Sequence, residues 1–335
     1  MFLIGAEFNV SLIQKRIRSA AFVSLAGILA PFILGSGVAL LMLRSQTLFA
    51  PGVAAWEAML FTGSAMSITA FPMLARIIYE RGLSGTTLGT LALAAGSIDD
   101  ALAWCLLAVV LASFGSNPMI AVSAIGGGVV YALVILLVLR PMLRRLDAKA
   151  QEHGHLTGPM LGFILMLVML GAWFTDTVGI YAVFGAFIMG IAMPRGIVTQ
   201  ELHRILEPVS TNFLLPLFFI YSGLNTRLGL IVSPGMWQIL ILVVLAAIVG
   251  KGVACWGAAR LSGETNRDAM AIGTLMNARG LMELILLNIG LERGVITPTM
   301  FTVMVIMAVV TTLMASPLFE WVYHGIRHPI TRVAS

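Results

Sequence analysis

The sequence predicts an all-α polytopic membrane protein, and three observations lead to this fold class. Hydrophobic residues make up 59% of the 335-residue chain and charged residues only 10%, whereas about a quarter of the residues in a soluble domain are charged. The apolar residues gather in long runs that are apolar on all faces. Basic residues lie almost entirely between these runs. Lipid must therefore be the main solvent of this chain.

Ten of these runs are long enough to cross a bilayer, because a helix needs roughly 20 apolar residues to span the roughly 30 Å hydrocarbon core. They are predicted at residues 20–43, 57–79, 86–113, 118–139, 158–175, 178–194, 205–224, 235–259, 268–290 and 298–323. Residues 1–10 are typical of the end of another apolar helix. We therefore expect about ten full transmembrane helices plus a partial first one. A β-barrel is excluded because its strands alternate apolar and polar residues over about ten positions.

The twenty Lys and Arg residues predict the orientation, since cytoplasmic loops collect positive charge. Alternate connections hold fifteen of them: Lys15, Arg16, Arg18, Arg76, Arg81, Arg140, Arg144, Arg145, Lys149, Arg195, Arg204, Arg260, Arg267, Arg327 and Arg332. The intervening connections hold three: Arg44, Arg227 and Arg293. We expect a multi-pass protein of the cell (inner) membrane with a cytoplasmic C-terminus. The net charge of +5 follows from this asymmetry and does not indicate a nucleic-acid partner.

Five charged residues lie well inside predicted spans, away from the span ends, and they are the candidates for function. They are Asp99, Asp100, Lys251, Arg279 and Glu283. A charged side chain at the bilayer centre costs roughly 2.5–3.5 kcal/mol on insertion scales. These residues must therefore pair with one another, become neutral or face water.

The adjacent carboxylates Asp99 and Asp100 predict ion or proton binding. Neighbouring helix positions point about 100° apart, so one carboxylate can meet Lys251 while the other lines a cavity. Two close carboxylates in a low-dielectric site allow a proton to move on and off near neutral pH. A carboxylate that holds either a hard monovalent cation or a proton suits an exchanger. The alternative is a set of buried ion pairs that only fix helix packing. That interpretation is preferred for Arg279 and Glu283, which lie four residues apart.

Two predicted spans contain interruptions, and transporters often bind substrate where discontinuous helices meet. The segment SAMSITAFP at 64–72 is rich in hydroxyls and ends in a proline, and Asn277–Gly280 interrupts a second span. Each interruption lies in the middle helix of a set of three. According to the charge pattern, the first set begins on the cytoplasmic side of the membrane and the second set begins on the outside. The sequence therefore predicts two inverted three-helix repeats with discontinuous helices.

These features favour a secondary transporter over an enzyme. The predicted substrates are H⁺ and a monovalent cation, either Na⁺ or K⁺. The predicted partner is the lipid bilayer, and no cofactor is expected. An ATP-driven pump is disfavoured because the chain has no G-x-x-x-x-G-K-[ST] phosphate loop. A K⁺ efflux system or cation channel built on the same fold is the alternative. The intramembrane Lys251 favours the exchanger, because a channel would not require this lysine to exchange a proton.

Several motifs give the chain a family resemblance. SITAFPMLARIIYERGL at 67–83, GSIDDALAW at 96–104 and MNARGLMELILLNIGLERGVI at 276–296 resemble the monovalent cation:proton antiporter-2 family, above all its plant cation/H⁺ exchangers and their bacterial relatives. FLIGAEF at 2–8 and FLLPLFFIYSGLNTRL at 213–228 are similar to further family segments. The likeness covers nearly the whole chain.

The resemblance implies the sodium/proton antiporter fold, with crossing discontinuous helices and an elevator-type movement. Residues 1–335 would form one membrane domain, with a core at 20–113 and 235–323 and panel, dimerisation and linker helices at 1–19 and 118–224. A homodimer is expected. The site residues that the resemblance implies are the ion-binding Asp100, Asp99 paired with Lys251, Thr69 at the crossing, and Ser67, Asn277, Arg279 and Glu283 as supporting core.

The cation and the extent of the chain are less clearly indicated by the resemblance. A double-aspartate site with a core lysine is associated with electrogenic sodium exchange in this family, whereas the surrounding plant-type motifs are associated with potassium.

Family members have further helices before the segment where this chain starts, and many carry a soluble regulatory domain after the last helix. An N-terminally truncated chain without a regulatory domain is therefore expected.

Overall fold

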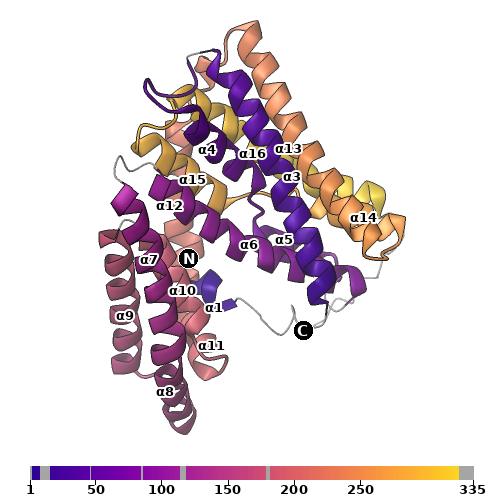
Figure 1. The fold of residues 1–335 in the computed structure, drawn as a ribbon. Coiled ribbons are helices and arrows are strands. Elements are labelled where there is room, and N and C mark those ends of the chain that lie inside the picture. The colour runs from indigo at the N-terminus through magenta and orange to yellow at the C-terminus, as the bar shows by residue number, and fades with distance from the viewer. Residues whose placement is uncertain are drawn as a thin grey trace. The chain divides into compact units, whose positions relative to one another are not determined.

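The computed structural model describes residues 2–7, 16–45, 47–83, 86–113, 118–178 and 182–323, and it is helical throughout these ranges apart from short connections (Figure 1). The chain divides into two compact units. One comprises Met1–Asn9 and Trp104–Leu224, and the other comprises Val10–Ala103 and Asn225–Ser335. The prediction of an all-α fold is confirmed.

The second unit contains two sets of helices from the two halves of the chain. The first set is α3 (Ile17–Leu43), α4 (Ala55–Ser67), α5 (Phe71–Glu80) and α6 (Thr87–Ser113), which belongs to this unit up to Ala103. The second set is the short 3₁₀ turn η3 (Leu228–Leu230), α13 (Pro234–Leu261), α14 (Asn266–Leu275), α15 (Leu281–Glu292) and α16 (Pro298–Val322). Helix α3 packs against both α4 and α13.

Both predicted interruptions are present in this unit. Helix α4 ends at Ser67 and α5 begins at Phe71, and α14 ends at Leu275 before α15 begins at Leu281. Helix α4 with α5, and α14 with α15, therefore form the discontinuous middle members of the two helix sets. The predicted interruptions of the two middle helices are confirmed, and the inverted relation of the two sets stays a prediction.

The start of each long helix in the second set is encoded locally. The Ser233 side chain accepts a hydrogen bond from the Met236 amide before α13, and Thr297 does the same for the Met300 amide before α16, each at 3.3 Å. A proline follows each capping residue, at the position where its missing N–H has no cost. These caps explain why the predicted starts at 235 and 298 agree closely with the structure.

Connections tie the two helix sets together. Phe49 and Ile296 form an isolated antiparallel bridge, and the Thr297 amide donates to the Leu48 carbonyl at 3.0 Å. Ion pairs join Arg16 to Glu264 and Arg81 to Glu320. The loops of one set are thus bonded to those of the other within this unit.

The close crossing of α3 and α4 depends on glycine. A Cβ atom built on Gly63 would lie 2.8 Å from the Phe32 carbonyl oxygen and 2.8 Å from the Ser36 Oγ. Small residues allow transmembrane helices to approach closely. No larger residue fits at Gly63 unless the α3 backbone moves.

The first unit consists of the remaining helices: α1 (Phe2–Glu7), α7 (Pro118–Val134), the π-helical turn η1 (Ile135–Leu139), α8 (Arg140–His153), α9 (Gly158–Thr177), α10 (Ala182–Ala192), α11 (Ile197–Val209), the π-helical turn η2 (Ser210–Leu214) and α12 (Leu215–Asn225). Helix α10 packs against α1 and α9. The predicted helical segment at the N-terminus is present over Phe2–Glu7.

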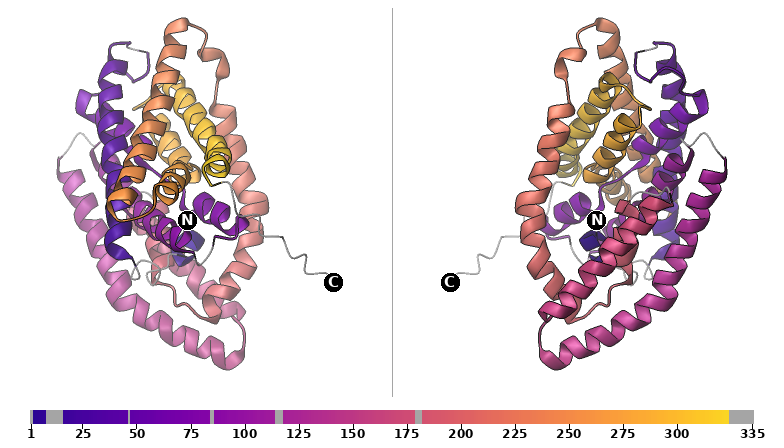
Figure 2. Two further views of the ribbon diagram at one scale, coloured as in Figure 1. Left: turned by 90° about the vertical axis from the view of Figure 1, so that its right-hand side faces the viewer. Right: turned by 90° about the vertical axis from the view of Figure 1, so that its left-hand side faces the viewer.

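The interpretation of residues 140–157 as a connection is wrong for most of its length. The chain continues from α7 through η1 into α8 as one run to His153, which both views in Figure 2 show in magenta. Gly154, with φ of 73°, then ends the helix in the left-handed conformation. The segment is rich in Arg, Lys, Ala, Gln and Glu, which favour helix without being apolar. A search for apolar runs therefore misses this extension.

The start of the seventh predicted span also differs from the structure. Helix α11 begins at Ile197, eight residues before the predicted 205, so Arg204 lies within a helix. Its first residues alternate apolar and polar groups at helical spacing, and hydropathy alone does not detect such a segment. Asp147 supports this helix start, because its Oδ1 accepts a hydrogen bond from the Val198 amide at 3.1 Å. Arg76, placed in a connection by the charge pattern, similarly lies within α5.

Seven segments of the described chain are long and apolar enough to cross a membrane. They are Ile17–Leu43, Ala55–Ile78, Gly126–His153, Gly158–Thr177, Ile197–Leu230, Pro234–Leu261 and Pro298–Val322. The three other predicted spans correspond to α6, α10 and the interrupted pair α14 and α15. Lys15, Arg327 and Arg332, which the charge pattern assigns to connections, lie outside the described residues.

Candidate ion-binding site

A buried ion pair joins the two helix sets of the second unit. Lys251 Nζ on α13 lies 2.8 Å from Asp99 Oδ2 on α6, and both side chains are fully buried. Lysine has three N–H donors. The other two are used as well, by the Gly27 carbonyl at 3.0 Å and the Ser67 carbonyl. The ammonium group is therefore fully hydrogen-bonded, as a buried charge requires.

Helix α3 supplies contacts that the sequence did not indicate. The Ser24 hydroxyl donates to Asp99 Oδ1 at 3.3 Å, and the Gly27 carbonyl accepts from Lys251. Helix α3 also contains Ser19 and Ser36, so nothing in the sequence distinguishes Ser24. These residues surround the ion pair from a third helix.

Two buried cations occupy the C-terminal end of α4, where the helix is interrupted. The Arg279 guanidinium donates to the Ala65 carbonyl at 3.0 Å and the Met66 carbonyl at 2.7 Å, and it lies 3.5 Å from the Ile68 carbonyl. Lys251 donates to the Ser67 carbonyl. The last carbonyls of a helix have no partner within it and carry the negative end of the helix dipole. Three consecutive carbonyls, those of residues 65–67, thus accept hydrogen bonds from cations of the opposite helix set.

The two interruptions also bond directly to each other. The Ala70 amide donates to the Ala278 carbonyl at 2.9 Å, and the Thr69 hydroxyl donates to the Met276 carbonyl at 3.2 Å. Thr69 is fully buried. Ser67 turns its hydroxyl to the Gly63 carbonyl at 2.7 Å. The two interruptions are therefore in direct contact through these hydrogen bonds.

Asp100 is placed differently from its neighbour. Its side chain is 1% exposed, its Oδ1 has no hydrogen-bond partner, and among the described residues it forms no ion pair. Asn277 also has an unpartnered buried oxygen, Oδ1, while its Nδ2 donates to the Gly273 carbonyl at 3.1 Å. Carboxylate and amide oxygens are ligands for hard cations. Asp100 is therefore a buried carboxylate with one oxygen that no group in the described residues satisfies.

Arg279 and Glu283 are both fully buried, with Nη1 and Oε2 3.4 Å apart. This separation is long for a charge-assisted hydrogen bond. The second carboxylate oxygen, Oε1, has no partner. The stronger contacts of Arg279 are those with the α4 carbonyls, so its clearest structural role is at the interruption.

Interrupted helices that cross beside buried carboxylates and buried cations in a polytopic helical protein are typical of secondary membrane transporters. Residues 1–323 match the family model described as "Sodium/hydrogen exchanger, transmembrane". The chain belongs to this family, and the predicted family resemblance is confirmed.

Several relatives support this assignment. The Na⁺/H⁺ antiporter NhaS4 of Synechocystis is 40% identical over 98% of this chain and 80% of the relative. Cation/H⁺ antiporter 19 of Arabidopsis thaliana is 35% identical over 98% of this chain and 41% of its own length. The K⁺/H⁺ antiporter 1 of Saccharomyces cerevisiae is 30% identical over 96% of this chain and 38% of its own length. This chain thus spans about two-fifths of the plant and yeast relatives.

The fold is also similar to a solved structure. The sodium proton antiporter MjNhaP1 of Methanocaldococcus jannaschii matches 95% of this chain with a TM-score of 0.62 and 17% identity, and 80% of that structure is covered. At this identity the match concerns the fold alone. The prediction of a sodium/proton antiporter fold is confirmed.

Proposed function

We propose that this protein exchanges Na⁺ or K⁺ for H⁺ across the membrane by alternating access, with the ion or proton held at Asp100. The observation that carries the proposal is the difference between the two adjacent carboxylates. Asp99 is neutralised by Lys251 at 2.8 Å, whereas Asp100 is buried with an unpartnered oxygen. An isolated buried carboxylate is costly unless it binds a counter-ion or a proton.

Competition between these two ligands provides the coupling. A cation at Asp100 requires the ionised carboxylate, and a proton removes that charge, so the two cannot be held together. The buried oxygen of Asn277 and the hydroxyl of Thr69 are proposed to support the cation. Lys251 and Arg279 hold the interrupted α4 in place while Asp100 changes its occupant.

The proposal also covers the domain movement, the oligomeric state and the membrane orientation of the protein. A core at 20–113 and 235–323 would move relative to panel helices at 1–19 and 118–224, within a homodimer in the cell (inner) membrane. The fifteen basic residues on one side of the predicted topology support a cytoplasmic C-terminus. The names of the relatives support both Na⁺ and K⁺ as candidates.

The test uses the purified protein in proteoliposomes that contain a pH-sensitive dye. Na⁺, K⁺ or Li⁺ is added outside, and wild type is compared with Asp100→Asn. Glu152→Gln, which removes an exposed carboxylate on α8, is the matched control. Cation-dependent proton movement should be present in wild type and Glu152→Gln and absent in Asp100→Asn, while all three proteins melt at similar temperatures.

The outcomes separate the alternatives. Proton movement that persists in Asp100→Asn would remove Asp100 from the mechanism. Cation flux without proton movement would favour the channel or efflux interpretation. The order of the three ions in wild type identifies the preferred cation.

A further inference from the structure

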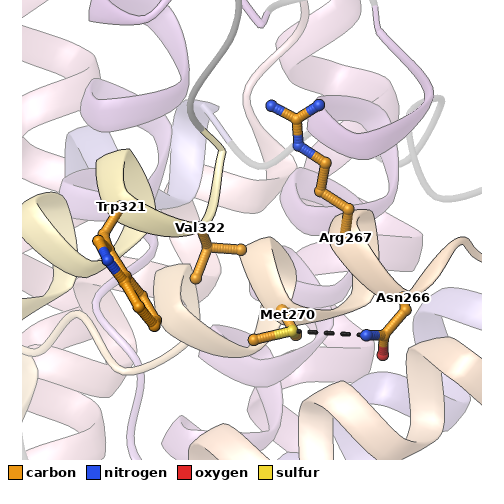
Figure 3. A pocket seen from close by; sticks show the side chains of 5 residues that line it. All are labelled: Asn266, Arg267, Met270, Trp321 and Val322. Atoms are coloured by element: carbon orange, nitrogen blue, oxygen red, sulfur yellow. Dashed lines mark hydrogen bonds between the residues drawn. The ribbon is translucent and has the colours of Figure 1, made fainter.

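The first turns of α14 and the last turn of α16 border an open cavity of about 380 Å³ (Figure 3). It is lined by Asn266, Arg267, Met270, Trp321 and Val322. Arg267 is the one charged residue among these five. The lining combines a guanidinium and an amide on α14 with an apolar wall on α16.

Aromatic residues place this cavity at the level of the lipid headgroups. Trp321 is 72% exposed at the end of a predicted membrane span, and Trp256 Nε1 donates to Asn266 Oδ1 at 3.0 Å. Trp and Tyr concentrate where a membrane helix meets the water interface. The end of α16 carries Tyr323 as well as Trp321. The residues that line the cavity on α14 and on α16 therefore both belong to the membrane–water interface.

The polar groups of the cavity can receive an anion. The Arg267 guanidinium lies 4.9 Å from the centre of the Tyr323 ring, which holds its position by a cation–π contact. The neighbouring Asp268 accepts from the Thr265 hydroxyl at 2.7 Å. Asn266 is exposed, and among the described residues its Nδ2 contacts the Met270 sulfur, at 3.7 Å, which is a weak acceptor. An oxyanion would be a stronger acceptor for this amide.

We propose that this cavity binds the phosphodiester group of an anionic phospholipid. Arg267 and Asn266 would donate to the phosphate oxygens, since guanidinium matches phosphate geometry, and an acyl chain would lie along Trp321 and Val322. Basic pockets between transmembrane helices are suited to such headgroups. The proposal does not depend on the cation that the protein transports.

The test measures bound lipid on the purified full chain by native mass spectrometry, with phosphatidylglycerol and phosphatidylcholine as probes. Arg267→Gln should lower the retention of phosphatidylglycerol relative to phosphatidylcholine by about fivefold, the effect expected for one basic residue at the membrane surface. Arg44→Gln, which removes another exposed arginine, should leave retention unchanged. Trp321→Ala provides a second variant and should also weaken phosphatidylglycerol binding, because it removes the apolar wall.

Two results would overturn the proposal. One is equal phosphatidylglycerol retention in wild type, Arg267→Gln and Trp321→Ala. The other is binding of inorganic phosphate with the same dependence on Arg267, because the cavity would then recognise free phosphate rather than a lipid. Melting temperatures in phosphatidylcholine identify any variant that has lost its fold. If Arg267→Gln has lost its fold, Arg267→Lys replaces it, and partial retention of phosphatidylglycerol is expected.

Discussion

Lys251 on α13 and Asp99 on α6 form an ion pair at 2.8 Å with neither side chain exposed. The pair connects helices from the two halves of the chain, and Lys251 also bonds to the Ser67 carbonyl at the interruption of α4. One lysine thus neutralises a carboxylate and stabilises a helix end. Asp100, next in sequence, is left with an unpartnered buried oxygen, and it is the carboxylate that we propose exchanges its ligand.

The first prediction concerns this ion pair. Lys251→Met should lower stability strongly, by roughly 3–5 kcal/mol, because the buried Asp99 charge then has no partner. The double variant Lys251→Met with Asp99→Asn should recover much of the loss, since neither charge remains. Melting temperatures in detergent micelles provide the ranking. Equal melting of the single and double variants would show that the charge pair does not determine stability.

The second prediction concerns Arg279. Arg279→Gln should destabilise by about 3 kcal/mol or more, because hydrogen bonds from a charged group contribute about 1.5–3 kcal/mol each and two carbonyls of α4 lose their donor. Arg279→Lys should rescue little, because an ammonium cannot reproduce the planar fork. Glu283→Gln should change melting much less, since its 3.4 Å contact is long. If Glu283→Gln is as damaging as Arg279→Gln, the ion pair matters more than the helix end.

The third prediction concerns the crossing of α3 and α4. Gly63→Ala should lower the melting temperature, because its Cβ would lie 2.8 Å from the Phe32 carbonyl oxygen. Gly37→Ala on α3 is the matched control, since a Cβ there meets nothing within 4 Å. It should be neutral or stabilise by up to about 1 kcal/mol, as alanine favours helix over glycine. Similar melting of both variants would mean that the helices can separate without cost.

The fourth prediction separates function from stability at Thr69. Thr69→Ala removes one hydrogen bond, to the Met276 carbonyl, and should cost only about 0.5–1.5 kcal/mol. If the hydroxyl supports the cation, the cation concentration for half-maximal exchange should rise clearly, and Thr69→Ser should restore it. Dye-based exchange assays and melting temperatures are measured on the same preparations. Unchanged cation dependence in Thr69→Ala would assign the residue a structural role alone.

Local patterns in the sequence were sufficient to predict the membrane helices and their interruptions. Apolar run length identifies a span, and the hydroxyls and proline near Pro72 or the polar residues at Asn277–Gly280 mark a break, so neither requires distant contacts. The same method failed at α8 and at the start of α11. These segments are helical but polar on one face, and hydropathy averages over that face.

The partners of the buried charges were decided by the tertiary structure. Spacing left open whether Asp99 or Asp100 meets a lysine 150 residues away, although the family resemblance favoured Asp99. The contacts of Arg279 with the carbonyls of α4, and those of Ser24 and Gly27 with the ion pair, had no signal in the sequence. They depend on how helices rotate and approach in the packed core, and this is set by many weak contacts, such as the one at Gly63, that no local pattern encodes.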